Sequence, residues 1–424
     1  MKAKEARTRL HRLLHVISRP ARRGATPGGL VVYPYRGYGS RGEIYLMGRV
    51  FRQAPRTGVS GGTLGDDLKD LTRRMFQRGV AGVRLAASLN GTQQRVTSDR
   101  DGYFRFHMRL AQPAHDALSP WQTLPIHLAQ TGAKSPVAHG QILVPPPQAQ
   151  RMVISDIDDT VIFTGVANKL MMLVRLFTQG AQSRVAFPGT AALYRALHHG
   201  RSGAEMNPML YVSRSPWGLY EVLDEFFNLH GIPIGPVLFL REWGLSPHRP
   251  FPRRSKGHKI ALIRKMMEIH SDLPCVLIGD SGQHDPEIYA RLVKEYPGRV
   301  GAVYIRNVGA SDERFASIES LAKEVAGQGS ALFLAADAFA MAEHMAREGL
   351  ISKKALGEVM TERVQQTDGS PLQPTRKVAG TDPQQTRAAV QAGQLKNEVE
   401  EGRGRSGRAP NVEVQSDSSR SDPG

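Results

Sequence analysis

The chain has almost no cysteine: among its 424 residues the single thiol is that of Cys275. With one cysteine no disulfide can form within the chain, which suits a reducing compartment such as the cytoplasm. The thiol lies inside the apolar run PCVLIGD, so we expect it to be buried as a small hydrophobic group. The sequence also lacks an uninterrupted apolar run of about 18 residues, so no membrane-spanning helix is predicted.

Acidic residues are in short supply as well. There are 39 of them against 56 lysines and arginines, which gives a formal net charge of +17. A charge of this sign predicts attraction to polyanions such as nucleic acid, anionic membranes or phosphorylated substrates, without choosing among them. The basic residues are dispersed and no motif that reads nucleic acid is present, so no specific nucleic-acid partner is expected.

The two ends of the chain differ from the middle in composition. Residues 365–424 have no aromatic side chain and are rich in Gln, Gly, Ser, Arg and Pro. They cannot bury enough apolar surface to order themselves, so we predict a disordered tail. Residues 1–28 form a basic arm in which leucines recur at helical spacing between arginines. This arm has two interpretations: an amphipathic helix on an anionic membrane, or a flexible or docked arm.

The region after the arm has the pattern of β structure. Residues 29–148 alternate apolar and polar side chains, with a turn signal at Asn90-Gly91. Near residues 65–80 the spacing of apolar side chains is typical of a helix instead. The sequence therefore predicts a small, β-rich, sandwich-like domain with a helical insertion.

Residues 149–350 follow another rhythm, in which short apolar strands alternate with helices. This alternation indicates an α/β domain, a Rossmann-like parallel sheet with helices on both faces. Right-handed crossovers place the carboxyl end of every such strand on one edge of the sheet, where ligands bind. The stretch PPPQAQ, residues 145–150, is then the linker from the β-rich domain.

A cluster of carboxylates follows the first strand of this α/β domain. The stretch RMVISDIDDTV places Asp156 and Asp158 directly after an apolar run. Carboxylates this close repel one another and lose hydration when they are buried, so we expect a bound cation to compensate. Other strands deliver Ser213, Asp280 and Asp285 to the same edge of the sheet. Carboxylate oxygens from two separate strands make a site suited to Mg²⁺.

Together these stretches resemble the haloacid dehalogenase superfamily of phosphohydrolases. The four motifs of that superfamily occur in its order: D-x-D-x-T, a serine that ends a strand, a lysine, and G-D-x-x-x-x-D. They fall here on Asp156, Asp158, Thr160, Ser213, Lys259, Gly279, Asp280 and Asp285. The longer strings ISDIDDTV, YVSRSPWGLY, HKIALI and LIGDSGQHDPEIYA, within residues 151–306, are similar to the catalytic domain of the actin-patch-associated phosphatidate phosphatase family and its uncharacterised bacterial relatives.

The resemblance implies an active site with two catalytic aspartates and a metal ion. Asp156 would be the nucleophile that forms an aspartyl-phosphate, and Asp158 would act as general acid and base. The Mg²⁺ ligands would be Asp156, the backbone carbonyl of Asp158, and Asp280, with Asp285 as a more distant or water-mediated partner.

The resemblance also implies the groups that bind the substrate. Ser213 and Lys259 would hold phosphate oxygens, one by a hydrogen bond and one by charge. Lys256 is an alternative for the lysine, because it lies in the same SKGHK stretch. Thr160 would fix the loop that follows the nucleophile, next to the bound phosphate.

The function that the resemblance implies is Mg²⁺-dependent hydrolysis of phosphatidate to diacylglycerol and phosphate. The single cysteine favours a cytoplasmic location, and the basic charge leaves peripheral contact with an anionic membrane open. Two alternatives stay open. One keeps the mechanism and changes the substrate to a soluble phosphomonoester. The other is a non-catalytic adaptor that binds membranes or proteins through the β-rich domain and the basic ends, although an adaptor gains nothing from clustered carboxylates.

Overall fold

The computed structural model describes residues 29–52, 79–113, 119–129, 137–157, 188–213, 220–239 and 256–367. Four groups of sequence predictions lie outside these ranges: the basic arm, all but the last two residues of the helix near residues 65–80, Asp158 with Thr160, and nearly all of the predicted tail. The start of that tail was placed slightly too early, since the last helix, α10 (Lys353–Thr367), continues past residue 365.

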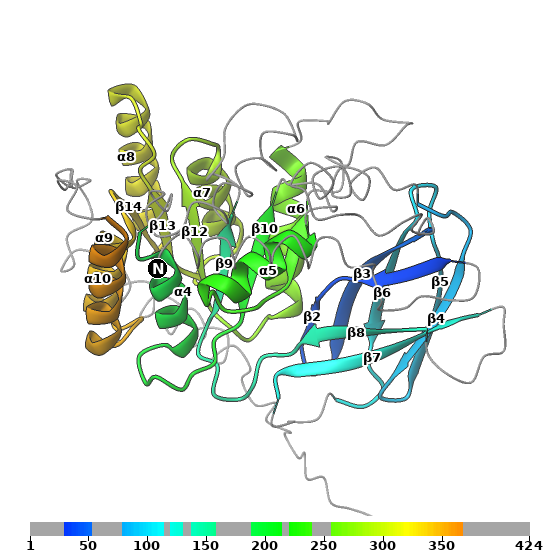
Figure 1. Ribbon diagram of the computed structural model, residues 1–424. Coiled ribbons are helices and arrows are strands. Elements are labelled where there is room, and N and C mark those ends of the chain that lie inside the picture. Colours follow the sequence, from blue (N-terminus) through cyan, green and yellow to red (C-terminus); the bar gives the residue numbers. More distant parts are fainter. Residues whose placement is uncertain are drawn as a thin grey trace, which may run out of the picture.

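Eight strands form the β-rich region, drawn in blue to cyan in Figure 1. They are β1 (Leu30–Pro34), β2 (Gly37–Gly39), β3 (Glu43–Arg52), β4 (Arg84–Leu89), β5 (Thr92–Thr97), β6 (Tyr103–Arg109), β7 (Trp121–Leu128) and β8 (Ala138–Leu143). Their order in the sheet is β1-β3-β2-β8-β7-β4-β5, with β6 also paired to β3. Every pairing is antiparallel except that of β2 with β8. All eight strands therefore belong to one hydrogen-bonded network.

Local sequence explains both the turns and the core of this sheet. Asn90 and Gly91, between β4 and β5, have φ of 46° and 77°, so the predicted two-residue hairpin is confirmed. Alternate residues of the strands, among them Ile44, Leu46 and Phe106, are completely buried in a core of the region's own. The apolar residues that recur at every second position of the sequence are thus those that face the core of this region.

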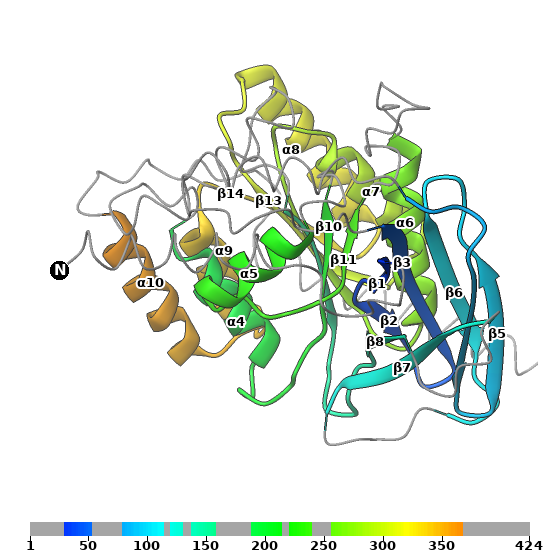
Figure 2. The same ribbon diagram turned by 45° about the vertical axis from the view of Figure 1, so that its right-hand side comes forward.

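The second sheet has six parallel strands in the order β11-β10-β9-β12-β13-β14. They are β9 (Met152–Asp156), β10 (Met209–Ser213), β11 (Val237–Phe239), β12 (Cys275–Asp280), β13 (Val300–Arg306) and β14 (Ala331–Ala335). The remaining helices are α4 (Thr190–His199), α5 (Tyr220–His230), α6 (Lys256–Ile269), α7 (Asp285–Glu295), α8 (Asp312–Gly327) and α9 (Ala338–Arg347). Figure 2 shows α4, α5, α9 and α10 on one face of this sheet and α6, α7 and α8 on the other. The predicted parallel sheet with helices on both faces is present.

The strand order reverses next to β9. From β9 the chain proceeds through β10 to β11 on one side, and then returns to β12, β13 and β14 on the other. The carboxyl ends of β9 and β12, which pair with each other, therefore flank the point of reversal. Open α/β sheets bind ligands in the crevice at this point, so the fold alone indicates where to look for a site.

The β-rich sheet packs against α5 and α6 of the α/β region. Its residues Tyr35, Tyr38 and Tyr45 belong to the same buried cluster as the core of the α/β region. Arg36 pairs with Asp224 of α5, and Lys265 of α6 lies 4.6 Å from the centroid of the Tyr45 ring. The two regions thus share a continuous apolar interface. In the part of the chain that the structure describes, none of the helices has the length and apolar character needed to cross a bilayer.

Candidate active site

Three neighbouring strands bring polar side chains to the point of reversal. β9 pairs in parallel with β10 on one side and with β12 on the other. Their last residues are Asp156, Ser213 and Asp280. In the pairing register Val212 stands opposite Asp156, so Ser213 lies one position further along the same edge. Ser213 and Asp280 are buried, as is the side chain of Asp156, and this convergence agrees with the prediction from the sequence.

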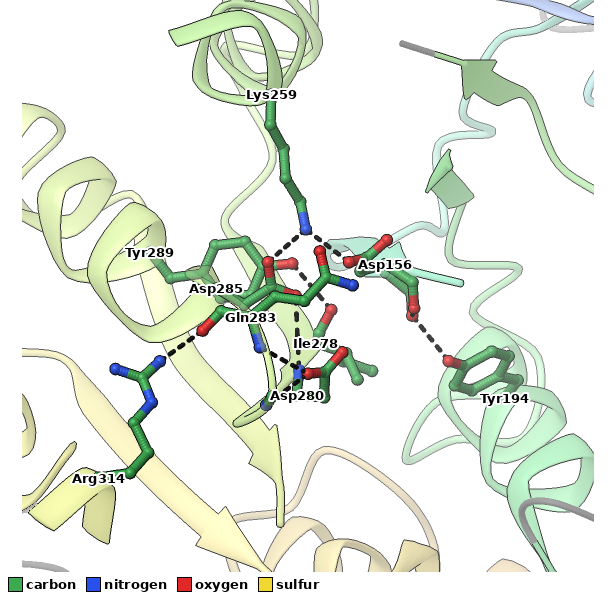
Figure 3. A network of polar contacts seen from close by, with 11 residues as sticks. Asp156, Tyr194, Lys259, Ile278, Asp280, Gln283, Asp285, Tyr289 and Arg314 are labelled. Atoms are coloured by element: carbon green, nitrogen blue, oxygen red, sulfur yellow. Dashed lines mark hydrogen bonds and ion pairs between the residues drawn. The ribbon is translucent and has the colours of Figure 1, made fainter. Parts of the chain in front are cut away.

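Lys259 enters from α6 and joins two carboxylates (Figure 3). Its side chain is 2% exposed, and its Nζ donates to Asp156 Oδ2 at 2.6 Å and to Asp285 Oδ1. The same ammonium group lies 5.7 Å from the centroid of the Tyr289 ring. Because charge-assisted hydrogen bonds in a buried place are strong and directional, Lys259 fixes the positions of β9, α6 and α7 relative to one another.

Asp285 is the first residue of α7 and points back beneath the end of β12. Its side chain is completely buried, and its Oδ2 accepts a hydrogen bond of 3.4 Å from the Asp280 amide. A Cβ atom on Gly279 would overlap the Asp285 carboxyl group. Glycine in this strand position is therefore what leaves room for the carboxylate.

Asp280 shapes the loop that leads to α7. Its Oδ1 accepts hydrogen bonds from the amides of Gly282, at 2.8 Å, and Gln283, at 3.2 Å. A carboxylate that receives two amides of the following residues closes a tight turn. Because of this turn, the chain returns at Asp285 to the end of β12, where the Asp285 carboxylate accepts from the Asp280 amide.

The electrostatics of the cluster depend on its burial. Burial raises the pKa of Asp285 to about 7, and the charge of Asp156 adds to this rise while Lys259 opposes it. For Lys259, burial favours the neutral amine, but the two carboxylates outweigh it and raise the pKa above its ordinary value. Lys259 is consequently an ammonium at neutral pH, and Asp285 takes up a proton as the pH falls through about 7.

The cluster fits a divalent cation. Asp156, Asp280 and Asp285 each place a carboxylate oxygen within 4.8 Å of the other two. Three ionised carboxylates and the one ammonium of Lys259 carry a formal charge of −2. Hard oxygen donors at this spacing suit Mg²⁺, whose charge would balance that of the cluster. A divalent cation would thus compensate the cost of burying these carboxylates together.

Several expected site residues cannot be placed from the structure. Asp158 and Thr160 lie outside the described residues, as does the side chain of Lys256. Lys259 was expected to hold a phosphate oxygen, and here its Nζ contacts two carboxylates. The roles given to these residues therefore stay predictions.

Two further residues support the site and were missed from the sequence. The Tyr194 hydroxyl, on α4, lies 2.7 Å from the Oγ of Ser155, which directly precedes Asp156. Arg314, on α8, contacts the loop between β12 and α7. The signal for α8 was available, because Ser311 is followed by two acidic residues and its Oγ accepts from the Arg314 amide. No comparable signal points to Tyr194.

The fold and the site define a doubly wound α/β protein with an acidic, lysine-containing site at the carboxyl edge of its parallel sheet. Residues 151–307 match the family described as phosphatidate phosphatase APP1, catalytic domain, and this segment belongs to that family of domains. Every acidic and lysine side chain of the cluster lies inside the matched segment.

Curated relatives are similar over the same part of the chain. Phosphatidate phosphatase APP1 of Saccharomyces cerevisiae is 32% identical over 155 residues, which are 36% of this chain and 25% of that protein. An uncharacterized protein of Schizosaccharomyces pombe is 30% identical over 165 residues, 37% of this chain and 25% of that protein. The chain thus spans about a quarter of the length of these relatives.

Among solved structures, a carbohydrate acetylesterase from Xanthomonas citri aligns with 79% of this chain and 73% of its own. The two are 12% identical and superpose with a TM-score of 0.23. Because a TM-score this low reflects no common fold, the alignment has no bearing on the function.

Proposed function

We propose that this protein is a Mg²⁺-dependent phosphatase of the haloacid dehalogenase type, which hydrolyses phosphatidate to diacylglycerol and phosphate. The observation that carries the proposal is the buried cluster of Asp156, Lys259, Asp280 and Asp285 within the segment that matches the APP1 catalytic domain. The name of the Saccharomyces relative supports phosphatidate as the substrate. The catalytic domain would cover residues 149–350.

Asp156 would attack the phosphorus atom and form an aspartyl-phosphate, releasing the alcohol. Its bond to Lys259 orients the carboxylate at the end of β9. Asp158 would give a proton to the departing alkoxide and then remove one from the water that hydrolyses the intermediate. Bound Mg²⁺ would supply positive charge between the carboxylate and the anionic phosphate.

The residues that would hold the metal ion and the phosphate are those that the family resemblance implies, and the buried carboxylate cluster supports the choice. Asp156 and Asp280, at the ends of adjacent strands, would bind Mg²⁺ together with the backbone carbonyl of Asp158. Asp285 would support the metal ion indirectly, through its bond to Lys259 or through a water molecule. Phosphate oxygens would be bound by Ser213 and by Lys259, and Thr160 would fix the loop that follows Asp156.

A substrate panel tests the proposal. Phosphate release would be measured from phosphatidate in mixed micelles and from soluble phosphomonoesters, each with Mg²⁺ and with EDTA. We expect Mg²⁺-dependent release from phosphatidate in strong preference to the soluble esters. Release from soluble esters alone would keep the chemistry and reject the lipid. Release from none of them would reject the enzyme and favour the adaptor.

We further propose that the protein acts in the cytoplasm, in contact with anionic membranes. The net charge of +17 supports such contact, and a lipid substrate requires it. Co-sedimentation with vesicles containing phosphatidate would be compared between the full chain and the chain lacking residues 1–23. Loss of binding on this deletion would support the basic arm as the anchor, whereas unchanged binding would remove that role from it.

A further inference from the structure

The loop between β12 and α7 joins two acidic residues of the site, Asp280 at its start and Asp285 at its end. One side chain from a different helix donates hydrogen bonds to the backbone of this loop. That side chain is Arg314 of α8, which lies beyond the matched residues 151–307 and belongs to none of the four sequence motifs. Figure 3 shows it on the side of the loop opposite to Lys259.

The guanidinium of Arg314 makes contacts at both ends of the loop. Its Nε donates to the carbonyl of Ser281 at 3.0 Å, and its Nη2 donates to the carbonyl of Gln283. Both terminal nitrogens also pair with Glu287, in the first turn of α7, with an Nη2–Oε2 distance of 3.1 Å. One planar group therefore links the loop to the helix that begins with Asp285.

The contact with Ser281 acts directly on Asp280 through a single peptide group. The carbonyl of Ser281 and the amide of Gly282 belong to the same planar trans unit and point in opposite directions. The carbonyl accepts from Arg314, and the amide donates to Asp280 Oδ1 at 2.8 Å. Rotating this unit would break both bonds, so Arg314 holds the amide in the orientation that the Asp280 carboxylate needs.

We propose that Arg314 is a positioning residue of the metal site, which sets the Asp280 carboxylate through the Ser281–Gly282 peptide and Asp285 through Glu287. The inference rests on the proposed function to the extent that the cluster holds Mg²⁺. A partner outside the ligand set that orients the ligands typically changes metal affinity by about 10- to 100-fold when it is removed.

Other contacts keep the loop folded when Arg314 is replaced. The Ser281 amide donates to the carbonyl of Arg306 at 2.9 Å, and the Ser281 Oγ accepts from the Val308 amide at 3.0 Å. These bonds tie the loop to the end of β13 independently of α8. A variant at Arg314 should therefore loosen the geometry of the site without unfolding the region.

The experiment measures Mg²⁺ binding by calorimetry to the full chain, freed of metal by EDTA. Arg314→Met should raise the Mg²⁺ dissociation constant by about 10- to 100-fold. Arg314→Lys should raise the dissociation constant by a similar factor. A single ammonium group cannot replace the planar guanidinium, which donates to two carbonyls and a carboxylate at once. Arg291→Met is the matched control. Arg291, on α7, is exposed and, among the described residues, pairs along its own helix with Glu295, so the dissociation constant should not change.

A second measurement separates positioning from general damage. At saturating Mg²⁺ the Arg314→Met protein should regain most of the wild-type phosphate release, so that the loss lies in metal affinity and not in turnover. Equal dissociation constants for Arg314→Met and Arg291→Met would overturn the inference. If Arg314→Met does not fold, Glu287→Gln replaces it, with a several-fold weaker affinity expected and an unchanged one overturning the role.

Failure of the proposed function is distinguishable from failure of this inference. Metal binding that depends on Arg314, without release of phosphate from any substrate, would reject the phosphatase and keep the positioning role. Absence of Mg²⁺ binding by the wild-type chain would overturn the metal site and the role of Arg314 together.

Discussion

Replacing Lys259 by Met tests the charge balance of the buried cluster. The Met side chain has a stem of similar length and leaves Asp156 and Asp285 without their shared ammonium. All three side chains are at most 2% exposed, so the small energies of surface ion pairs do not apply. Removing one partner from a buried pair costs about 3–5 kcal/mol, and we expect a loss of this size in the free energy of unfolding of the metal-free protein.

The loss should grow with pH, for a reason that the structure supplies. The pKa of Asp285 lies at about 7 in the folded protein, above the value of about 4 for an unfolded aspartate. The folded state therefore binds more protons than the unfolded state between these values, and the stability of the metal-free protein falls as the pH rises through this window. Lys259 lowers the pKa of Asp285, so without it that carboxyl group is harder to ionise and the fall extends to higher pH. The loss should lie near the lower end of the range at pH 6 and near the upper end at pH 8.

Urea unfolding in EDTA, followed by circular dichroism at pH 6 and pH 8, measures this effect. Lys294→Met is the matched control, because Lys294 is an exposed lysine on α7. The control should change the free energy of unfolding by no more than about 0.5 kcal/mol. A loss for Lys259→Met below about 1 kcal/mol at both pH values, in the range of surface pairs, would refute the reasoning.

Two more predictions concern the metal site. Gly279→Ala should weaken Mg²⁺ binding about tenfold or more, because the added Cβ displaces Asp285, whereas Gly301→Ala, which has only a 3.8 Å contact with the carbonyl of Cys275, should not. Equal affinities of the two variants by calorimetry would contradict this. Because the pKa of Asp285 is about 7 without metal, Mg²⁺ binding at pH 6 should release close to one proton, and the affinity should fall about tenfold per pH unit below pH 7. Calorimetry in two buffers of different ionisation enthalpy measures the released protons, and none at pH 6 would exclude Asp285 as the titrating group.

Periodicity alone was enough to predict most of the fold. The continuous apolar run of β12 indicates a strand covered on both faces, and the alternating run of β6 indicates a strand with one buried face. The helix α8 was missed because its pattern is mostly polar, with only Phe315, Ile318, Ala322 and Val325 buried. The short strand β2 was missed because three residues are too few to show an alternation of apolar and polar side chains.

The candidate site was predictable where its residues end strands, since the topology gathers strand ends at one edge. Asp156, Ser213 and Asp280 are placed in this way. What the sequence could not show is how side chains pair across elements. Lys259 bonds to two carboxylates, and Arg314 donates to a loop some 30 residues earlier in the chain. Both sets of contacts depend on how the helices pack and on the side-chain rotamers that this packing allows.

The central claim is that Asp156 is the nucleophile of a phosphatase. The most direct test compares phosphate release from phosphatidate, at saturating Mg²⁺, by the wild type, by Asp156→Asn and by the control Asp272→Asn, in which an exposed aspartate is changed. The account predicts that Asp156→Asn abolishes release while its circular dichroism spectrum stays that of the wild type, and that Asp272→Asn retains full activity. An Asp156→Asn protein that releases phosphate at the wild-type rate would contradict the account.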